Sequence, residues 1–131
     1  MSHLSFETKK RLKKELDRLL LELQEGKIIV EGKKDKIALN KIGLKNVYTL
    51  QGDYRRIVEN LKQKNVQKVF ILTDFDRRGE ELAEKLKGEL IGQAIDFDLE
   101  KRKRLGAILN IRFWESADTK LEQFLEKIKE N

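Results

Sequence analysis

The amino-acid sequence predicts an α/β domain in which helices cover both faces of a parallel sheet. Short apolar runs alternate along the chain with longer segments whose leucines and isoleucines recur at helical spacing, a pattern typical of strand–helix units. The run Val69–Leu72 is continuously apolar, as expected for a strand that is buried on both faces. The chain has 131 residues and neither a linker nor an internal repeat, so we expect one domain over residues 1–131.

An amphipathic helix is expected over residues 5–25, before the core of the domain. Ser5 can cap its N-terminus, and Gly26 ends it. Its apolar face carries Leu12, Leu16, Leu19, Leu20 and Leu23. Its other face carries the basic residues Lys9, Lys10, Arg11, Lys13, Lys14 and Arg18. This basic face is either solvated charge or a surface that grips phosphates.

The core of the domain is expected over about residues 26–97. Strands are predicted at 27–31, 46–50 and 69–74, with a fourth parallel strand at 93–97. Helices are predicted at 33–42, after Asp53, and at about 80–90. The sequence leaves the order of the strands in the sheet open.

The C-terminal extension, residues 98–131, is expected to be mostly helical. A helix over 98–109 carries the basic run Lys101–Arg104, and an amphipathic helix is predicted over 117–129. Between them, residues 111–114 read as a short edge strand. We expect Phe113 and Trp114 to belong to the core rather than to a platform on which bases stack.

Composition excludes several classes of site. There is no cysteine, and His3 is the only histidine, so thiolate chemistry, a Ser-His-Asp triad and a multi-histidine zinc site are excluded. No apolar run is long enough to span a membrane and no secretory signal is visible, so we expect a cytoplasmic protein without a membrane partner. The formal net charge of +6 favours a polyanionic partner such as nucleic acid.

Three acidic residues follow two of the predicted strands. Asp74 and Asp76 come after the buried run 69–72, and Glu31 ends an earlier strand that lies two strand–helix units upstream. Because parallel strands end at the same edge of a sheet, these carboxylates should share one edge if the two strands are neighbours. An all-oxygen site suits Mg²⁺, or Mn²⁺, and such a site serves phosphoryl transfer.

Small and basic residues flank these acids. Gly32 and Gly79 follow them closely, and a residue without a side chain lets a phosphate or a metal approach the backbone. Four basic residues could hold phosphates or could simply be solvated charge, namely Lys33, Lys34, Arg77 and Arg78. The basic segments 9–18 and 101–104 suggest a longer polyanion.

A plainer interpretation of the acids is also open. The Asp-x-Asp pattern after a strand is common where an acid caps the following helix, and Glu31-Gly32 is ordinary turn chemistry. Asp35 is expected to be a first-turn acid of its helix. The occurrence of both patterns at this spacing favours a functional site.

Two motifs resemble those of the Toprim domain. Residues 30–35, Val-Glu-Gly-Lys-Lys-Asp, are similar to its first motif, and residues 73–79, Thr-Asp-Phe-Asp-Arg-Arg-Gly, are similar to its Asp-x-Asp-x-x-Gly motif. Bacterial-type primases, type IA and type II topoisomerases, old-family nucleases, a recombination-repair protein and ribosomal-RNA maturation nucleases share this domain. The resemblance covers about residues 26–97, and the whole chain most resembles small stand-alone Toprim proteins of archaea and some bacteria.

The resemblance implies a three-layer, Rossmann-like sheet and specific roles for the acids. It implies that Glu31 is the general acid/base and that Asp74 and Asp76 bind Mg²⁺, with help from Glu31. Arg78 stands where type IA topoisomerases have a further acid, so a third acid after this strand is not supported. We expect neither a self-sufficient topoisomerase, which needs a tyrosine nucleophile from another domain, nor a complete primase.

The first hypothesis is therefore a Mg²⁺-dependent phosphoryl-transfer domain, most plausibly a nuclease acting on RNA or DNA. The second is a non-catalytic module whose metal organises a loop that docks nucleic acid or a larger RNA-processing or replication assembly. A phosphatase or signalling receiver is disfavoured, because Arg78 does not fit its motif and because it gives Glu31 no role.

Overall fold

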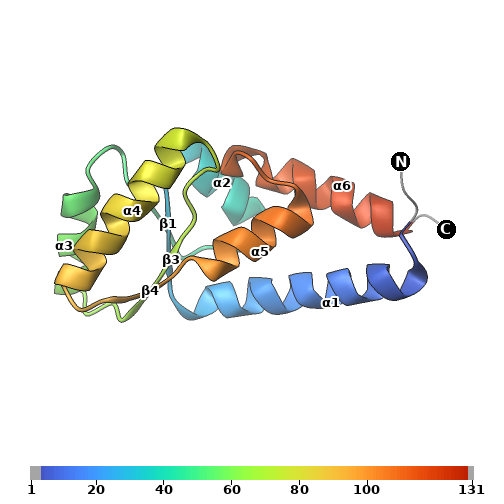
Figure 1. The fold of residues 1–131 in the computed structure, drawn as a ribbon, viewed down its shortest axis with the longest axis horizontal. Coiled ribbons are helices and arrows are strands. Elements are labelled where there is room, and N and C mark those ends of the chain that lie inside the picture. Colours follow the sequence, from blue (N-terminus) through green and yellow to red (C-terminus); the bar gives the residue numbers. More distant parts are fainter. Residues whose placement is uncertain (1–3, 130–131) are drawn as a thin grey trace.

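The computed structural model describes residues 4–129, so His3 lies outside the described residues. It contains a four-stranded, fully parallel sheet with the strand order β2-β1-β3-β4, which confirms the predicted α/β fold (Figure 1). The strands are β1 (Lys27–Val30), β2 (Val47–Thr49), β3 (Lys68–Ile71) and β4 (Asp96–Asp98).

Helices pack on both faces of the sheet, as predicted (Figure 1). One face is covered by α3 (Tyr54–Gln63) and α4 (Arg77–Gly92). The other face is covered by α1 (Phe6–Glu22), α2 (Lys33–Lys41), α5 (Glu100–Leu109) and α6 (Ala117–Lys129). Two short 3₁₀ helices complete the described chain, η1 (Leu23–Glu25) and η2 (Trp114–Ser116).

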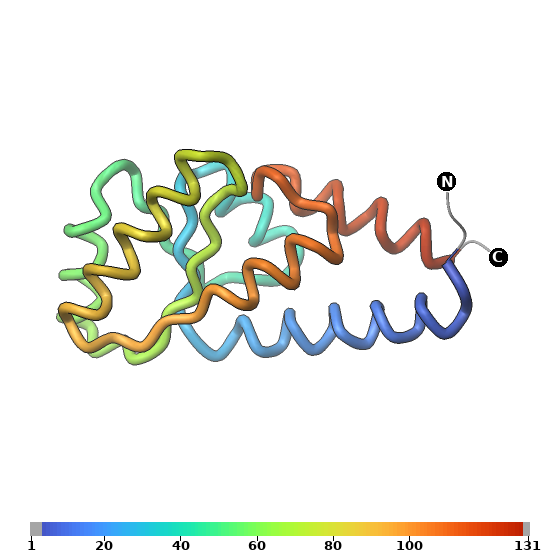
Figure 2. The backbone as a smooth tube through the Cα atoms, in the orientation of Figure 1, coloured from blue at the N-terminus to red at the C-terminus, as the bar shows by residue number. Residues whose placement is uncertain are grey.

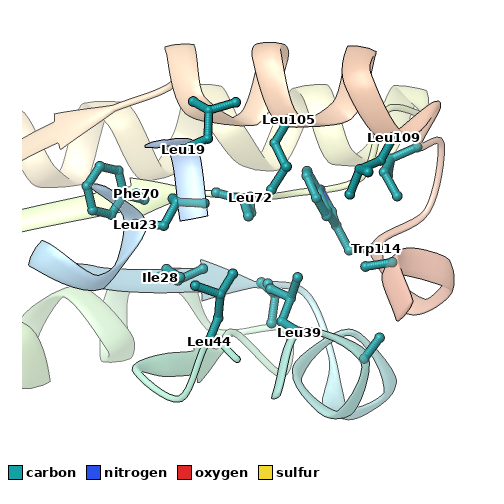
Figure 3. Close-up of a cluster of buried hydrophobic side chains, with 14 of the residues drawn as sticks. Leu19, Leu23, Ile28, Leu39, Leu44, Phe70, Leu72, Leu105, Leu109 and Trp114 are labelled. Carbon is teal, nitrogen blue, oxygen red and sulfur yellow. The ribbon is translucent and has the colours of Figure 1, made fainter. Parts of the chain in front are cut away.

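After their first residues, Lys27 and Lys68, the central strands β1 and β3 are apolar because both of their faces are buried. Ile28 and Val30 of β1 point into the larger cluster of apolar side chains, whereas Ile29 between them points into the smaller one under α3 and α4. Phe70 and Leu72 likewise enter the larger cluster, where Figure 3 shows them with the leucines of α1, α2 and α5. The run Val69–Leu72 is therefore continuously apolar because the strand is buried on both faces, as predicted from the sequence.

The strand order places a topological switch point between β1 and β3. The chain leaves β1 through α2 on one face of the sheet, and it leaves β3 through α4 on the opposite face. Because these two strands are neighbours, the connections diverge from their carboxyl ends. Such a switch point is where open α/β sheets bind their ligands.

The N-terminal helix is attached to the rest of the fold by apolar contacts and by one strong ion pair. The hydroxyl oxygen of Ser5 accepts a hydrogen bond from the Thr8 N–H at 3.1 Å, so Ser5 caps α1 as predicted. The Arg104 guanidinium donates two hydrogen bonds, of 2.8 and 2.7 Å, to the Glu15 carboxylate and so joins α5 to α1. Figure 2 shows that α1 begins and α6 ends at the same end of the molecule.

Several boundaries differ from the prediction, such as the end of β3 at Ile71 rather than Asp74, and two of the differences have a clear local cause. Helix α4 begins at Arg77 rather than near Glu80, because the Asp76 carboxylate caps it by accepting a hydrogen bond from the Gly79 N–H at 2.7 Å. The last strand is β4 rather than 93–97, because Ala94 has a left-handed backbone (φ 58°) and the Ile95 N–H still bonds to the Leu90 carbonyl at 3.0 Å. The chain therefore reverses before it enters the sheet.

The predicted edge strand at 111–114 is wrong. This segment runs beside the residues that follow β3, and the Phe75 N–H donates one hydrogen bond to the Arg112 carbonyl at 2.9 Å. The ladder goes no further because the Trp114 N–H is bound by the Asp74 side chain instead of by a main-chain carbonyl. The segment bends at Arg112 and Phe113 and enters η2 at Trp114, so it does not join the sheet. No helix within residues 4–129 is long and apolar enough to cross a membrane.

Candidate functional site

Glu31 and Asp74 meet at the switch point, at the carboxyl ends of β1 and β3. Glu31 directly follows β1, and its Oε2 atom accepts a hydrogen bond from the Asp74 N–H at 2.8 Å. The two strands are neighbours, so the condition under which the acids share one edge is met. We call Glu31, Asp35, Asp74 and Asp76 the acid edge.

Two members of the acid edge also cap helices. Asp76 caps α4 through the Gly79 N–H, and the Asp35 Oδ2 atom accepts a hydrogen bond from the Gly32 N–H at 3.0 Å in the first turn of α2. The expected position of Asp35 in the first turn of its helix is confirmed. The plainer interpretation of Asp76 as a helix cap is also correct, and it accounts for one of the two oxygens of this carboxylate.

Each of the three predicted site acids retains one oxygen for another partner. Glu31 uses Oε2, Asp76 uses Oδ1, and Asp74 uses Oδ1 to accept a hydrogen bond from the Trp114 N–H at 2.9 Å. Within residues 4–129, the second oxygen of each carboxylate has no hydrogen-bond partner. The backbone thus fixes one oxygen of each acid, while the other remains available to a ligand.

The negative charge of the acid edge is not compensated. Burial, and after it the neighbouring carboxylates of Asp35, Glu31 and Asp76, together raise the pKa of Asp74 to about 6, against the opposing hydrogen bond from the Trp114 N–H. A carboxyl group whose pKa is raised by burial and by like charges is a candidate ligand for a cation, which would relieve the repulsion.

Asp35 shares this environment. Burial raises the pKa of its carboxyl group, and the neighbouring carboxylates of Glu31 and Glu115 act in the same direction. The N–H groups of Gly32 and Glu115 favour the ionised form and oppose this rise. The loop after α5 therefore supplies backbone donors to two acids, from Trp114 to Asp74 and from Glu115 to Asp35.

Arg102 holds the main chain that carries Asp74, a role that the sequence did not reveal. It is buried, and its guanidinium donates to the Thr73 carbonyl at 2.7 Å and to the Asp74 carbonyl at 2.6 Å. The same group pairs with Glu80 at 2.8 Å and lies over the Phe75 ring, 4.2 Å from its centroid. Its charge is thus directed at main-chain carbonyls and at Glu80, and not at the carboxylates of the edge.

The basic run 101–104 is therefore not the polyanion surface that the sequence suggested. Arg102 is buried, Arg104 is bound to Glu15, and the ammonium of Lys101 lies 3.9 Å from Glu22. Within the described chain, Lys103 is the member of the run that is both exposed and without an ion pair. The expectation for this segment is wrong because three of its four cations serve to hold α5 in place.

Trp114 closes the site from the side of the larger apolar cluster. It is completely buried among residues such as Leu72, Leu105 and Leu109, as Figure 3 shows, so the prediction that it belongs to the core is confirmed. Its indole N–H donates to the Thr73 carbonyl at 2.9 Å. The main chain and the side chain of this one residue therefore hold Thr73 and Asp74 in place.

The two glycines of the motifs differ in their surroundings. A Cβ atom on Gly79 would lie 1.9 Å from the Asp74 carbonyl oxygen, so this glycine lets the first turn of α4 rest directly on Asp74. The nearest atom to a Cβ on Gly32 would be an Asp35 oxygen 4.0 Å away, so the space beside Gly32 is open. Contact of either glycine with a phosphate stays a prediction.

The predicted phosphate-binding side chains are all exposed near the acid edge. Lys33 and Lys34 open α2, and Arg77 and Arg78 open α4. Arg77 pairs with Glu81 of the next turn at 3.2 Å. In the described part of the chain the other three basic residues form no ion pair, which leaves them available to an anion.

The donor chemistry of the acid edge fits a hard cation such as Mg²⁺, because carboxylate oxygens without hydrogen-bond partners are the ligands that it prefers. Among residues 4–129, however, no three Asp, Glu or His side chains are arranged to hold one ion as they stand. The side chains of Glu31, Asp74 and Asp76 would have to turn toward a common point to share an ion.

Comparison with known proteins agrees with the two motifs. The profile of the Toprim domain family matches residues 27–108, from the start of β1 into α5. A UPF0292 protein of Thermococcus sibiricus is 36% identical over 97 residues, which cover 72% of this chain and 77% of the relative. A UPF0292 protein of Thermococcus onnurineus is 42% identical over 84 residues, which cover 64% of this chain and 63% of the relative.

A solved structure supports the fold independently. A putative protein from Aquifex aeolicus superimposes with a TM-score of 0.68 and is 37% identical. The match covers 77% of this chain and 96% of that protein. The sheet and the helices that carry the acid edge therefore belong to a fold that has also been seen by experiment.

Proposed function

Because this chain belongs to the Toprim domain family and is a relative of the UPF0292 proteins, we propose that it is a Mg²⁺-dependent nuclease that cleaves RNA or DNA at the acid edge. Membership of the family supports a metal-dependent role connected with nucleic acid. The observation that carries the finer proposal is the hydrogen bond between Glu31 and the main chain of Asp74, which joins the acids of two separate strands at one edge.

The acids have distinct roles in this proposal. Asp74 and Asp76 hold Mg²⁺ through the oxygens that accept no hydrogen bond from the described chain, with help from Glu31. The bound ion neutralises charge on the phosphate that is attacked. Glu31 moves a proton to or from an attacking or leaving oxygen, and its backbone partner Asp74 orients it for that task.

The exposed basic residues hold the rest of the substrate. Lys33, Lys34 and Arg78 lie at the N-termini of α2 and α4 without ion pairs in the described chain, and Arg77 has only a solvent-exposed one. A helix N-terminus also attracts anions. These groups would contact phosphates on either side of the scissile bond.

A second function is favoured by one specific observation. The acids of the edge cap α2 and α4 and are not arranged to hold one ion as they stand. This suits a non-catalytic module in which a metal orders the edge so that it docks nucleic acid or a larger RNA-processing or replication assembly.

Cleavage assays with conservative variants separate the two functions. Glu31→Gln and Asp76→Asn keep an oxygen that can accept the same backbone hydrogen bond, so both variants should fold. We expect each to lower Mg²⁺- or Mn²⁺-dependent cleavage of labelled RNA or DNA by roughly 100-fold or more, as removal of a catalytic group commonly does. Glu84→Gln, at an exposed position of α4, is the matched control.

Equal cleavage by the wild type and both variants would reject the assignment of the acids. Salt-sensitive binding of nucleic acid without turnover would favour the docking module. As a second readout, Mg²⁺ should raise the melting temperature of the wild type and of Glu84→Gln but not that of Asp76→Asn.

A further inference from the structure

Phe113 is an exposed aromatic side chain directly beside the acid edge. Its backbone is extended (φ −126°, ψ 127°), so its side chain and that of Trp114 point in opposite directions. Trp114 is completely buried, whereas Phe113 is 38% exposed. The expectation that both residues belong to the core is therefore wrong for Phe113.

The backbone around Phe113 is fixed on both sides. The Arg112 carbonyl accepts a hydrogen bond from the Phe75 N–H at 2.9 Å, and the Trp114 N–H donates to Asp74 at 2.9 Å. The Phe113 carbonyl accepts hydrogen bonds from the hydroxyl and the N–H of Ser116, at 2.8 and 3.1 Å. The main chain that carries the ring is thus held in a set position relative to the Asp74 carboxylate, which reduces the entropy that is lost when a ligand binds.

The chemistry at this position suits a nucleotide. The Arg112 guanidinium lies over the Phe113 ring, 5.3 Å from its centroid, and Arg112 is itself exposed. An aromatic face binds a base by stacking, and a neighbouring arginine can stack as well or bind a phosphate. In a duplex the faces of the bases are covered by their neighbours, so this mode of binding requires an unpaired base.

The adjoining surface offers room for a second nucleotide. A groove of about 420 Å³ lies between the start of α6 and α2, on the residues that follow Trp114. Ser116 and Thr119 supply hydroxyl groups to it, and Ile37 supplies an apolar wall. Its charges are mixed, because Lys34 and Lys41 line it together with Glu115 and Asp118, and Lys41 pairs with Asp118 at 3.6 Å, which leaves Lys34 as the lining cation without an ion pair in the described chain. A strand that places one base on Phe113 could continue along this groove.

We propose that Phe113, together with Arg112, stacks on an unpaired base and so makes the acid edge selective for single-stranded nucleic acid. This inference rests on the proposed function in one respect, because it requires nucleic acid to approach the acid edge. It does not require cleavage, and its test measures binding alone.

Binding assays with Phe113→Leu provide that test. The probes are a labelled 12-nucleotide single strand, as RNA and as DNA, and a blunt hairpin, all in Ca²⁺ at low salt. We expect Phe113→Leu to bind both single strands about tenfold more weakly than the wild type, the effect of losing one stacked base. Its affinity for the hairpin should change less than twofold. Phe6→Leu, which alters a 75% exposed phenylalanine on α1, should leave all affinities unchanged.

Phe113→Trp keeps the aromatic face and adds a direct readout. The one tryptophan of the wild type, Trp114, is buried, so new fluorescence would come from the introduced indole. We expect this variant to bind the single strands as the wild type does and its fluorescence to be quenched by them. Arg112→Gln should reduce the dependence of binding on salt by about one phosphate contact.

Unchanged single-strand binding by Phe113→Leu, or an equal loss for the hairpin, would overturn the inference. If cleavage depends on Glu31 and Asp76 while Phe113→Leu binds and cleaves like the wild type, only the stacking inference fails. If no cleavage is found but Phe113→Leu loses single-strand binding, the nuclease proposal fails and the stacking inference holds.

Discussion

The pKa values of Asp74 and Glu15 are shifted in opposite directions, although both residues lie close to an arginine of α5. Glu15 receives two hydrogen bonds from the Arg104 guanidinium, and this pairing lowers the pKa of its carboxyl group. Burial raises the pKa of Asp74 to about 6, and Arg102 donates to the main-chain carbonyl of Asp74 rather than to its carboxylate.

The contrast shows which charges are structural. Where α1 is attached to α5, the bidentate Arg104 compensates the charge of the Glu15 carboxylate. At the acid edge the fold places four acids near one another and directs the nearest buried cation away from them. Uncompensated charge in a crevice costs stability, and such sites are commonly functional. The difference between Glu15 and Asp74 supports the proposal that the acid edge binds a cation.

The largest effect should come from exchanging the buried arginine. Arg102→Met leaves the Thr73 and Asp74 carbonyls without their charged donor and removes the partner of Glu80. We expect a loss of about 3 kcal/mol in the free energy of unfolding. Chemical denaturation measures it, with Arg104→Met as the matched control on the same helix. The Arg104 pair reaches solvent, so a larger loss for Arg104→Met would reverse the comparison.

An intermediate effect, of opposite sign, is expected for Asp74→Asn in metal-free protein. The pKa of Asp74 is higher in the folded chain (about 6) than its ordinary value of 3.8, so the folded state binds the proton more tightly. The stability of the wild type should therefore fall as the pH rises from 4 to 6. Asn keeps an oxygen for the Trp114 N–H and carries no charge.

Asp74→Asn should thus gain about 1 kcal/mol at pH 7.5 in EDTA, a figure discounted because the side chain is only partly buried. At pH 3.5 the variant and the wild type should be equally stable. Thermal melts across this range provide the measurement. A variant less stable than the wild type at pH 7.5 would mean that the Asp74 charge is compensated after all.

The smallest effect is expected at the compensated carboxylate. Arg104 holds the pKa of Glu15 below its ordinary value of 4.5, so the pair stabilises the fold above that pH, and the contribution is lost as the pH falls through the folded pKa. Glu15→Gln should cost less than about 1 kcal/mol at pH 7, as solvent-accessible pairs do. Urea titrations at pH 7 and pH 3.5 measure the difference, which should be smaller at the lower pH.

The sequence was sufficient to predict the layers of the fold, and it predicted that Glu31 and Asp74 share one edge on the condition that their strands are neighbours. Apolar runs and helical spacing identified four strands and the main helices, since these patterns follow from burial. The strand order could not be predicted, because it depends on packing between segments that are distant in the sequence. The placing of Glu31 and Asp74 at one edge was therefore conditional until β1 and β3 were seen to be neighbours.

Arg102 was missed because a run of four basic residues suggests a solvated face. A signal was available in the helical phase, since Arg102 lies three and seven residues before Leu105 and Leu109, which are both buried. No such signal exists for the backbone N–H groups of Trp114 and Glu115, which reach Asp74 and Asp35. Every residue type except proline carries the same main-chain N–H group, so the sequence does not indicate which of these groups will reach a carboxylate. These donors to the acid edge could be identified only from the structure.

The hydrogen bond from the Asp74 N–H to Glu31 makes one amide proton a reporter on the position of the proposed general acid/base. While Glu31 points at the backbone, that proton is shielded; when Glu31 turns toward an ion or a phosphate, the proton loses its acceptor and exchanges with deuterated solvent more rapidly. The chemical shift of this single amide would therefore follow the resting and engaged positions of Glu31 without any label on the substrate.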